Sequence, residues 1–370
     1  MAFSPPIVPI NDLSRRFEPD TELVKSITDL IVNGPYLNSK YTNAFESEFA
    51  SFVGVEFCVA VSSGTAALEL AIKALELPAN SVILMTANAG GYSAIAARNA
   101  GYRTRYVDVD EFGLLGLHDL NRNLEDVSAI IVTHLYGQMC DMNALSIFAS
   151  KNNLKVIEDC AQAVGSRHGA IPAGAFGDVS AFSFYPTKNL GGIGDSGAVC
   201  TKSQRLANRV RELREYGWSE RYFSAVSGGG NFRNDEIQSL VLLEQLTSLH
   251  ARNIIRKKIW NRYFEICNLY GLQILGSTAN DFVPHLAVLK ISRREEFLKH
   301  MNERNISVAI HYPFPDFLQP GLIFEEGDSL IRTTLHCNQV VSIPLFPEMT
   351  EAEICRVEEG LSDFFGRVYD

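Results

Sequence analysis

Short apolar runs alternate with amphipathic segments between residues 58 and 201. Runs of this kind, bounded by turn residues, are typical of buried strands. A repeat of strand and helix favours a largely parallel sheet that is covered by helices. The sequence therefore predicts an α/β fold, with strands at 58–61, 82–87, 103–108, 129–134, 156–159, 179–184 and 198–201.

Helical spacing of apolar residues predicts further elements outside this region. Phe45, Phe49 and Phe52 fall on one face of a helix, and we expect their rings to lie in the core. A second helix is expected over 21–31. A run of arginines also recurs at helical spacing, which we interpret as a solvated helix face: Arg205, Arg209, Arg211 and Arg214.

A long helical stretch over 235–270 predicts a bridge from a large domain to a smaller one. The chain beyond it has an α+β pattern, with strands expected at 285–291 and 306–312. A final helix follows Thr350, which lies in capping-box register with Glu353. At 370 residues the chain exceeds a typical single core. We therefore expect a large domain over 1–249, including an N-terminal arm, and a small domain over 250–370.

Composition and charge narrow the class of protein. The net charge of −10 argues against a surface for nucleic acids. The seven cysteines show neither CxxC nor Cys/His ligand spacing, so reduced thiols are favoured over disulfides, and no metal site is expected. No stretch has the apolar length of a membrane span or the pattern of a signal peptide. We expect a cytoplasmic protein.

Polar residues follow several predicted strands where each strand ends. They include Ser63, Asn88, His134 and Asp159. Ligands of parallel sheets gather at the carboxyl ends of the strands, so these side chains mark the expected site. The Ser-Ser-Gly-Thr turn at 62–65 precedes a helix, where it forms either an anion site or only a helix cap. We interpret His134 as a structural histidine.

The pair of Asp159 and Lys188 carries the clearest chemical signal. Strand alternation sends Glu158 and Asp159 to opposite faces, and Asp159 is the better candidate because small and polar residues follow it. Lys188 lies on a glycine-rich turn after the next strand. Pyridoxal phosphate (PLP) chemistry requires such a pair, because the lysine makes the Schiff base and the carboxylate keeps the pyridine nitrogen protonated.

Two strings in this region resemble a known family. EDCAQA, from Glu158, and SFYPTKNLGGIGDSGA, from Ser183, are similar to the DegT/StrS group of nucleotide-sugar aminotransferases. The likeness extends from about Val8 to the C-terminus. It implies the three-layer PLP-dependent transferase fold type I, like that of aspartate aminotransferase, with a mostly parallel central sheet and a smaller α+β C-terminal domain.

The resemblance also implies roles for single residues. Lys188 is the internal Schiff base, and afterwards the acid/base that moves a proton between substrate and cofactor. Asp159 faces the pyridinium nitrogen and Gln162 the ring hydroxyl. The phosphate contacts come from the amides of Gly64 and Thr65 and from Ser183.

One implied contact crosses a subunit boundary. Asn231 corresponds to a family residue that touches the PLP phosphate of the partner subunit, which implies a homodimer with shared sites. The chain also departs from the family at Gly90, where members usually carry an aromatic residue stacked on the pyridine ring. Tyr92 is our candidate to supply that ring.

The resemblance favours C3 of the sugar as the position of amination. Members that act at C4 often carry His where this chain has Tyr185, whereas those that act at C3 tend to read as this chain does. His311 and Tyr312 match a stretch that borders the sugar and nucleotide pocket.

The expected activity is amino transfer from L-glutamate to C3 of a dTDP-linked 3-keto-6-deoxyhexose. The product would serve surface glycans, such as lipopolysaccharide O-antigen, or glycosylated metabolites. A UDP-linked 3-keto sugar and a 4-keto nucleotide sugar remain open as acceptors. A sugar dehydratase of this group would carry His at the place of Lys188. From another class, a non-catalytic PLP-binding sensor or scaffold remains an alternative, and a dinucleotide binder is disfavoured because no GxGxxG follows the first strand.

Overall fold

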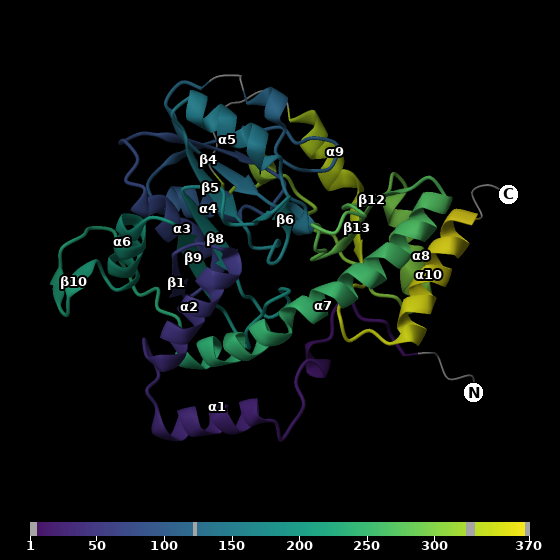
Figure 1. Ribbon diagram of the computed structural model, residues 1–370. Helices are drawn as coiled ribbons and strands as arrows, with labels where there is room; N and C mark the ends of the chain where they lie inside the picture. The colour runs from purple at the N-terminus through teal and green to yellow at the C-terminus, as the bar shows by residue number, and fades with distance from the viewer. Residues whose placement is uncertain (1–5, 121–123, 323–329, 367–370) are drawn as a thin grey trace.

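A seven-stranded sheet lies at the centre of the computed structural model, which describes residues 6–120, 124–322 and 330–366 (Figure 1). β9 runs antiparallel to its neighbours β1 and β8, and the remaining pairs are parallel. The predicted, mostly parallel α/β sheet is thus confirmed. In spatial order the strands are β1 (Phe57–Val61), β9 (Gly197–Thr201), β8 (Val179–Ser183), β5 (Lys155–Asp159), β4 (Val127–Thr133), β2 (Val82–Thr86) and β3 (Arg103–Val107).

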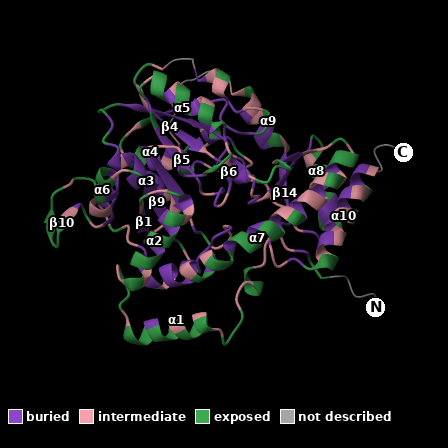
Figure 2. Ribbon diagram, viewed as in Figure 1, coloured by how far each residue is buried: buried purple, intermediate pink, exposed green. Residues whose placement is uncertain are grey.

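Helices cover both faces of this sheet, which gives the predicted three layers (Figure 1). Alternate residues of β1 show why: Val59 and Val61 belong to one apolar core, and Cys58 and Ala60 to the core on the other face. Figure 2 shows the strands and the inner helix faces as buried. One face carries α3 (Gly64–Ala74), α4 (Tyr92–Asn99) and α6 (Gln204–Arg214), and the other carries α2 (Lys40–Val53), α5 (Met142–Lys151) and the first half of α7 (Glu236–Leu269).

Phe45 and Phe49 of α2 are fully buried, as predicted, and Phe52 packs partly buried against the same core. The interpretation of the arginine run was wrong for one residue. Arg214, at the end of α6, is buried, and its Nη1 donates to Glu46 Oε1 at 2.8 Å and to Ala60 O at 3.0 Å. Helical spacing alone could not indicate that a carboxylate from α2 reaches this position.

A second, antiparallel sheet of three strands forms beyond the central one (Figure 1). α7, with 34 residues, runs from the first sheet to the second, as expected from the sequence. The proposed boundary between residues 249 and 250 falls inside this helix and stays a prediction. This region contains β12 (Gln273–Leu275), β13 (Ala287–Lys290), β14 (Val340–Ile343), α8 (Arg294–Glu303), α9 (Ile331–Gln339) and α10 (Glu351–Gly366).

The predicted capping box at the start of α10 is confirmed. The backbone N–H of Glu353 donates to Thr350 Oγ1 at 3.3 Å, and the Thr350 N–H donates to Glu353 Oε2 at 2.8 Å. Two amides at the helix start thereby gain partners. Within the described ranges, the helices lack the combination of length and apolar character that crossing a membrane requires.

The strand expected at 306–312 was a wrong prediction. Only isolated bridges form there, from Ile306 to Val8 and from Ala309 to Ser342. The partner of Ile306 is the N-terminal arm, far away in sequence, and the chain leaves β14 after Ala309. As a result, the residues that follow turn toward the central sheet instead of extending the small one.

The N-terminal arm pairs with the small-sheet region at Val8 and Ile306, and the helix that follows it contacts α7. The arm contains the short helix η1 (Leu13–Arg15), and α1 (Glu22–Asn33) follows, close to the predicted range. In Figure 1 α1 lies at the lower edge of the molecule, beneath α7. Its only buried residue among those described is Leu30. A hairpin of β10 (Trp218–Glu220) and β11 (Phe223–Ser224) also projects from the body of the chain.

Candidate active site

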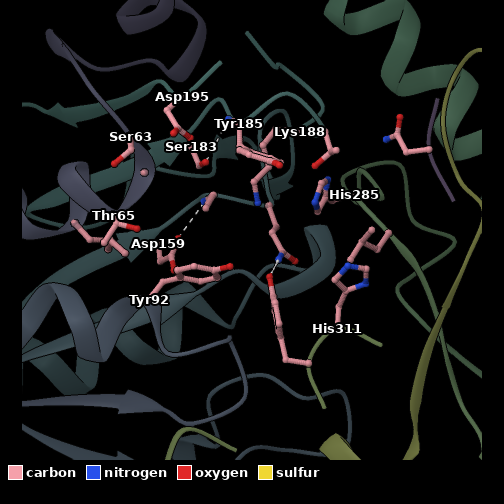
Figure 3. A pocket seen from close by; sticks show the side chains of 18 of the residues that line it. Ser63, Thr65, Tyr92, Asp159, Ser183, Tyr185, Lys188, Asp195, His285 and His311 are labelled. Atoms are coloured by element: carbon pink, nitrogen blue, oxygen red, sulfur yellow. Dashed lines mark hydrogen bonds between the residues drawn. The ribbon is translucent and has the colours of Figure 1, made fainter. Parts of the chain in front are cut away.

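A cavity of about 440 Å³ opens at the carboxyl ends of β5 and β8, between the two sheets (Figure 3). Its wall combines the large sheet, the N-terminal arm and the segment after residue 306. The sequence-predicted residues that line it are Gly64, Thr65, Tyr92, Asp159, Gln162, Ser183, Tyr185, Lys188, His311 and Tyr312. Residues scattered over 249 positions are therefore brought together here.

Lys188 lies on the turn after β8, as predicted. Its N–H donates to the Tyr185 carbonyl at 2.8 Å, which closes the turn. Burial lowers the pKa of the Lys188 amine to about 8, and the nearby Asp159 carboxylate partly opposes this shift. An amine with such a pKa is partly neutral near physiological pH, and the neutral amine is the nucleophile for a carbonyl.

Asp159 ends β5 and faces the same cavity. Its Oδ1 accepts the Ala161 N–H at 3.1 Å, and its Oδ2 accepts the Thr133 hydroxyl at 3.4 Å. Burial raises the pKa of Asp159, while the Ala161 N–H and the positive Lys188 act in the opposite direction. A buried carboxylate that accepts only these two hydrogen bonds among the described residues is suited to bind a protonated ring nitrogen.

Glu158 points to the opposite face, as strand alternation predicts. Its Oε2 accepts from His134 Nε2 at 3.0 Å, and its oxygens also accept the N–H groups of Gly174, Phe176 and Gly177. Cys160 lies close by, so these three side chains could in principle bind a metal ion. Because the Glu158 oxygens already accept four donors, the cluster is a structural network, which agrees with the interpretation of His134.

The start of α3 has the geometry of an anion-binding cradle. Ser63 caps the helix, with its Oγ accepting the Ala66 N–H at 3.1 Å. The next amides, at Gly64 and Thr65, belong to the first turn, where no intrahelical acceptor exists and the helix dipole favours negative charge. A Cβ on Gly64 would lie 2.5 Å from the Ser183 Cβ, so the absence of a side chain lets Ser183 border the same place.

Gln162 connects the cavity to the small-sheet side. Its Oε1 accepts the Tyr136 N–H at 2.7 Å, and its Nε2 donates to the Tyr312 hydroxyl at 3.1 Å. Burial raises the pKa of the Tyr312 phenol, with further contributions from Tyr92 and Asp159, so the phenol stays protonated. The amide orientation of Gln162 is fixed because a backbone N–H can only donate.

The rings of Tyr92 and Tyr312 converge at Gly90, the position where the resemblance implies an aromatic side chain. A Cβ on Gly90 would lie 3.0 Å from atoms of both rings, and the backbone φ of +79° is one that favours glycine. The two rings meet edge to face, with centroids 6.2 Å apart. The space of the missing side chain is thus filled, although which ring covers a cofactor stays a prediction.

Asn231 is not among the described residues that line this cavity. It is exposed, and its Oδ1 accepts from Arg233 Nε at 3.1 Å. This placement is what a contact to a partner subunit would need, and the contact itself stays a prediction.

His285 lines the cavity, and the sequence analysis missed it. Its Nδ1 lies 3.0 Å from Asn189 Oδ1, and the Asn189 amide donates to the Pro284 carbonyl at 3.3 Å and to Asn253 at 3.0 Å. Since Asn189 must donate through Nδ2, its oxygen accepts, and His285 carries its proton on Nδ1. Burial, then the charges of Lys188 and Arg256, lower the pKa of His285, so the ring is neutral. The one signal in the sequence that could have indicated His285 was its place at the start of a predicted strand.

Other residues of the cavity come from segments without a motif. Ile10 and Asn11 belong to the N-terminal arm, and Asp195 follows the glycines after Lys188. Thr187, Leu286 and Leu345 add to the wall, together with Ser63, Leu68 and Ala161. The arm therefore forms part of the site, which no local sequence pattern indicated.

Comparison with known proteins gives one consistent result. Residues 18–362 match the sequence profile of the DegT/DnrJ/EryC1/StrS aminotransferase family. A dTDP-3-amino-3,6-dideoxy-alpha-D-galactopyranose transaminase of Aneurinibacillus thermoaerophilus is 33% identical, over 97% of this chain and 99% of its own. A UDP-N-acetyl-3-dehydro-alpha-D-glucosamine 3-aminotransferase of Acidithiobacillus ferrooxidans is 33% identical, over 95% of this chain and 96% of its own. The crystal structure of S. venezuelae DesV in complex with a ketimine intermediate has a TM-score of 0.92 and 32% identity, and covers 97% of this chain and 99% of that one.

Proposed function

Because the chain belongs to the DegT/DnrJ/EryC1/StrS aminotransferase family, we propose that it transfers an amino group from L-glutamate to C3 of a dTDP-linked 3-keto-6-deoxyhexose. This family depends on PLP, so the family, the class of enzyme and the cofactor expected from the sequence are confirmed. The observation that carries the proposal is the meeting of Lys188 and Asp159 in one cavity beside the start of α3.

The residues of the cavity fit PLP. The first amides of α3 with Ser183 suit a phosphate, and the buried Asp159 suits a protonated ring nitrogen. When bound, PLP supplies the electron sink for amino transfer. Lys188 holds the cofactor and then, as the free amine, moves the proton at the substrate carbon. General acid/base catalysis of this kind contributes about a hundredfold to ten-thousandfold.

Two observations favour a 3-keto sugar. Relatives that are about one third identical over nearly the whole chain are transaminases whose names specify a 3-amino or 3-dehydro sugar. Tyr185, which replaces the histidine expected for C4 amination, lies at the cavity and is half exposed, where an acceptor would enter. The first of these relatives, which acts on a dTDP sugar, supports the dTDP carrier.

The alternatives differ in acceptor or in class. The second relative, which acts on a UDP sugar, supports a UDP-linked 3-keto acceptor, and a 4-keto acceptor is disfavoured by Tyr185. A non-catalytic sensor would not need a lysine whose pKa burial lowers to about 8 beside a buried carboxylate. The biosynthetic use of the product in O-antigen or in glycosylated metabolites belongs to the same proposal.

We also propose a homodimer with shared sites. In α1 the side chains of Ile31 and Val32 are 60% and 71% accessible, and Leu30 is the buried residue of this helix among those described. Exposed apolar side chains on a helix at the edge of the molecule favour a partner. A second copy of the chain would cover them and bring its Asn231 to the phosphate cradle.

The experiment is a product analysis with a panel of acceptors. Protein loaded with PLP is incubated with L-glutamate and with dTDP- and UDP-linked 3-keto and 4-keto sugars, and NMR locates the new C–N bond. We expect amination at C3 of the dTDP-linked 6-deoxy sugar and stoichiometric 2-oxoglutarate. Amination at C4, or no product with any acceptor, would refute the proposal.

A further inference from the structure

Arg16 of the N-terminal arm lies behind the turn that carries Lys188. Its Nη1 donates to the Pro186 carbonyl at 2.6 Å, and its Nη2 donates to the carbonyls of Lys188 at 3.3 Å and Asn189 at 3.4 Å. A fourth bond runs from its Nε to Gln245 Oε1, at 3.1 Å, on α7. One planar guanidinium therefore binds three carbonyls around the proposed reactive residue.

Gly191 makes room for this contact. A Cβ on Gly191 would lie 2.7 Å from Arg16 Nη1 and 2.6 Å from the Pro186 carbonyl oxygen. The first glycine of the predicted string thus accommodates the arginine from the arm. Without that arginine, the turn would keep the hydrogen bond from the backbone N–H of Lys188 to the Tyr185 carbonyl. The three carbonyls that Arg16 binds would lose their donor.

The positive guanidinium of Arg16 binds neutral carbonyl groups of the turn. Burial and, to a lesser degree, the positive Arg252 lower its pKa to about 10, and Glu348 opposes both. The group therefore stays protonated at neutral pH. Among the described residues, its hydrogen bonds go to the three carbonyls and to Gln245.

We propose that Arg16 is a positioning residue that holds the Lys188 turn in the orientation from which the amine reaches the cofactor aldehyde. This inference rests on the proposed role of Lys188. The arm then contributes to the reaction in two ways, since its Ile10 and Asn11 line the cavity and Arg16 supports the lysine from behind. Misplacement of a reacting group by about 1 Å can cost a hundredfold in rate.

The test compares covalent with non-covalent cofactor binding. PLP must bond to Lys188, whereas pyridoxamine phosphate binds through the phosphate cradle and Asp159 without that bond. In Arg16→Met we expect the rate of PLP attachment to fall at least tenfold and the affinity for pyridoxamine phosphate to change less than twofold. Borohydride reduction and mass spectrometry of the Lys188 peptide report the attachment. A merely structural role would weaken both forms of binding together.

Three further variants keep the outcome decisive. Arg15→Met is the matched control, because the neighbouring Arg15 binds Asp12 and Glu353 and not the turn. Gln245→Leu removes the link to α7 but leaves the carbonyl contacts, so its attachment rate should stay within twofold of the wild type. In Arg16→Gly, added guanidinium ion should restore PLP attachment in a saturable way. This rescue experiment replaces the Arg16→Met comparison if Arg16→Met does not fold.

The outcomes separate this inference from the proposed function. If the wild type forms no bond between PLP and Lys188, both are wrong. If the wild type is normal and the Arg16 variants attach PLP at the same rate, only the inference is wrong. It is equally wrong if Gln245→Leu is as slow as Arg16→Met, because anchoring of the arm would then be the whole effect.

Discussion

Gly64 lies directly against Ser183, so that a methyl group on Gly64 would sit 2.5 Å from the Ser183 Cβ and 3.2 Å from its Cα. The contact joins the first turn of α3 to the end of β8. It places the start of α3, with its free amides and positive dipole end, next to the Ser183 hydroxyl. Ser183 itself precedes Lys188 by only a few residues. The anion cradle and the lysine turn are therefore parts of one packed unit.

Gly64→Ala should weaken PLP binding at least tenfold while the fold persists. The added methyl must push either the α3 start or the β8 end, because the nearest atoms include backbone of Ser183. Equilibrium dialysis with PLP, together with circular dichroism, measures both effects. Gly321→Ala is the control, since a Cβ there meets no atom of the described residues within 4 Å. An affinity equal to the wild type would contradict the cradle.

The rate of PLP attachment should rise with pH and level off above a midpoint near 8. Burial lowers the pKa of Lys188 to about 8, and the neutral amine that attacks the aldehyde accumulates as pH passes that value. In Asp159→Asn the carboxylate that raises this pKa is gone, so the midpoint should move to lower pH. Stopped-flow absorbance of PLP follows the reaction.

Lys188→Ala serves as the control for this profile. It should fold, show no covalent PLP at any pH, and lose turnover by about a hundredfold to ten-thousandfold. A wild-type midpoint at the ordinary lysine value of 10.5, or full activity of Lys188→Ala, would count against the assignment.

Thr350→Ala should destabilise the protein by about 1 kcal/mol without affecting the chemistry. The substitution removes the acceptor of the Glu353 N–H, so one amide at the start of α10 loses its partner. Thermal melting of the protein measures the loss, and Thr247→Ala is a matched control because its hydroxyl bonds a carbonyl inside α7. Equal melting temperatures for Thr350→Ala and the wild type would mean that the cap contributes nothing.

The elements that the sequence predicted well are those whose signal is local. The strands of the central sheet, α7 and the capping box of Thr350 and Glu353 depend on periodicity, length and residues three apart. The family motifs then indicated which strand-end residues share a cavity. Alternation placed Asp159 and Glu158 on opposite faces, the small and polar residues after Asp159 favoured it as the site residue, and the structure places both as expected.

What the sequence did not indicate depends on contacts between distant segments. His285 was interpreted only as the start of a strand, because its partner Asn189 lies 96 positions away. Arg214 was placed on a solvated face, although Glu46 of α2 binds it in the interior. Arg16 had no motif at all, since its acceptors are carbonyls, which every residue carries.

Mixing two inactive variants should restore part of the activity if the sites are shared between subunits. A chain with Lys188→Ala lacks the amine, and a chain with Asn231→Ala lacks the proposed phosphate contact to its partner's site. In a mixed dimer, the lysine of the second chain meets the asparagine of the first, so one site is intact and the other carries both lesions. The mixture is unfolded and refolded so that mixed dimers form. Activity is then assayed at a PLP concentration too low to saturate Asn231→Ala on its own, which measures the recovery.

Two controls complete the mixing experiment. Each variant refolded alone should stay at its own low activity, and Val32→Glu on both chains should prevent recovery, because a charge on the exposed face of α1 would oppose dimer formation. If each site were built from one chain, every site in the mixture would carry one lesion. Activity would then equal the average of the separate variants, and the shared-site proposal would be wrong.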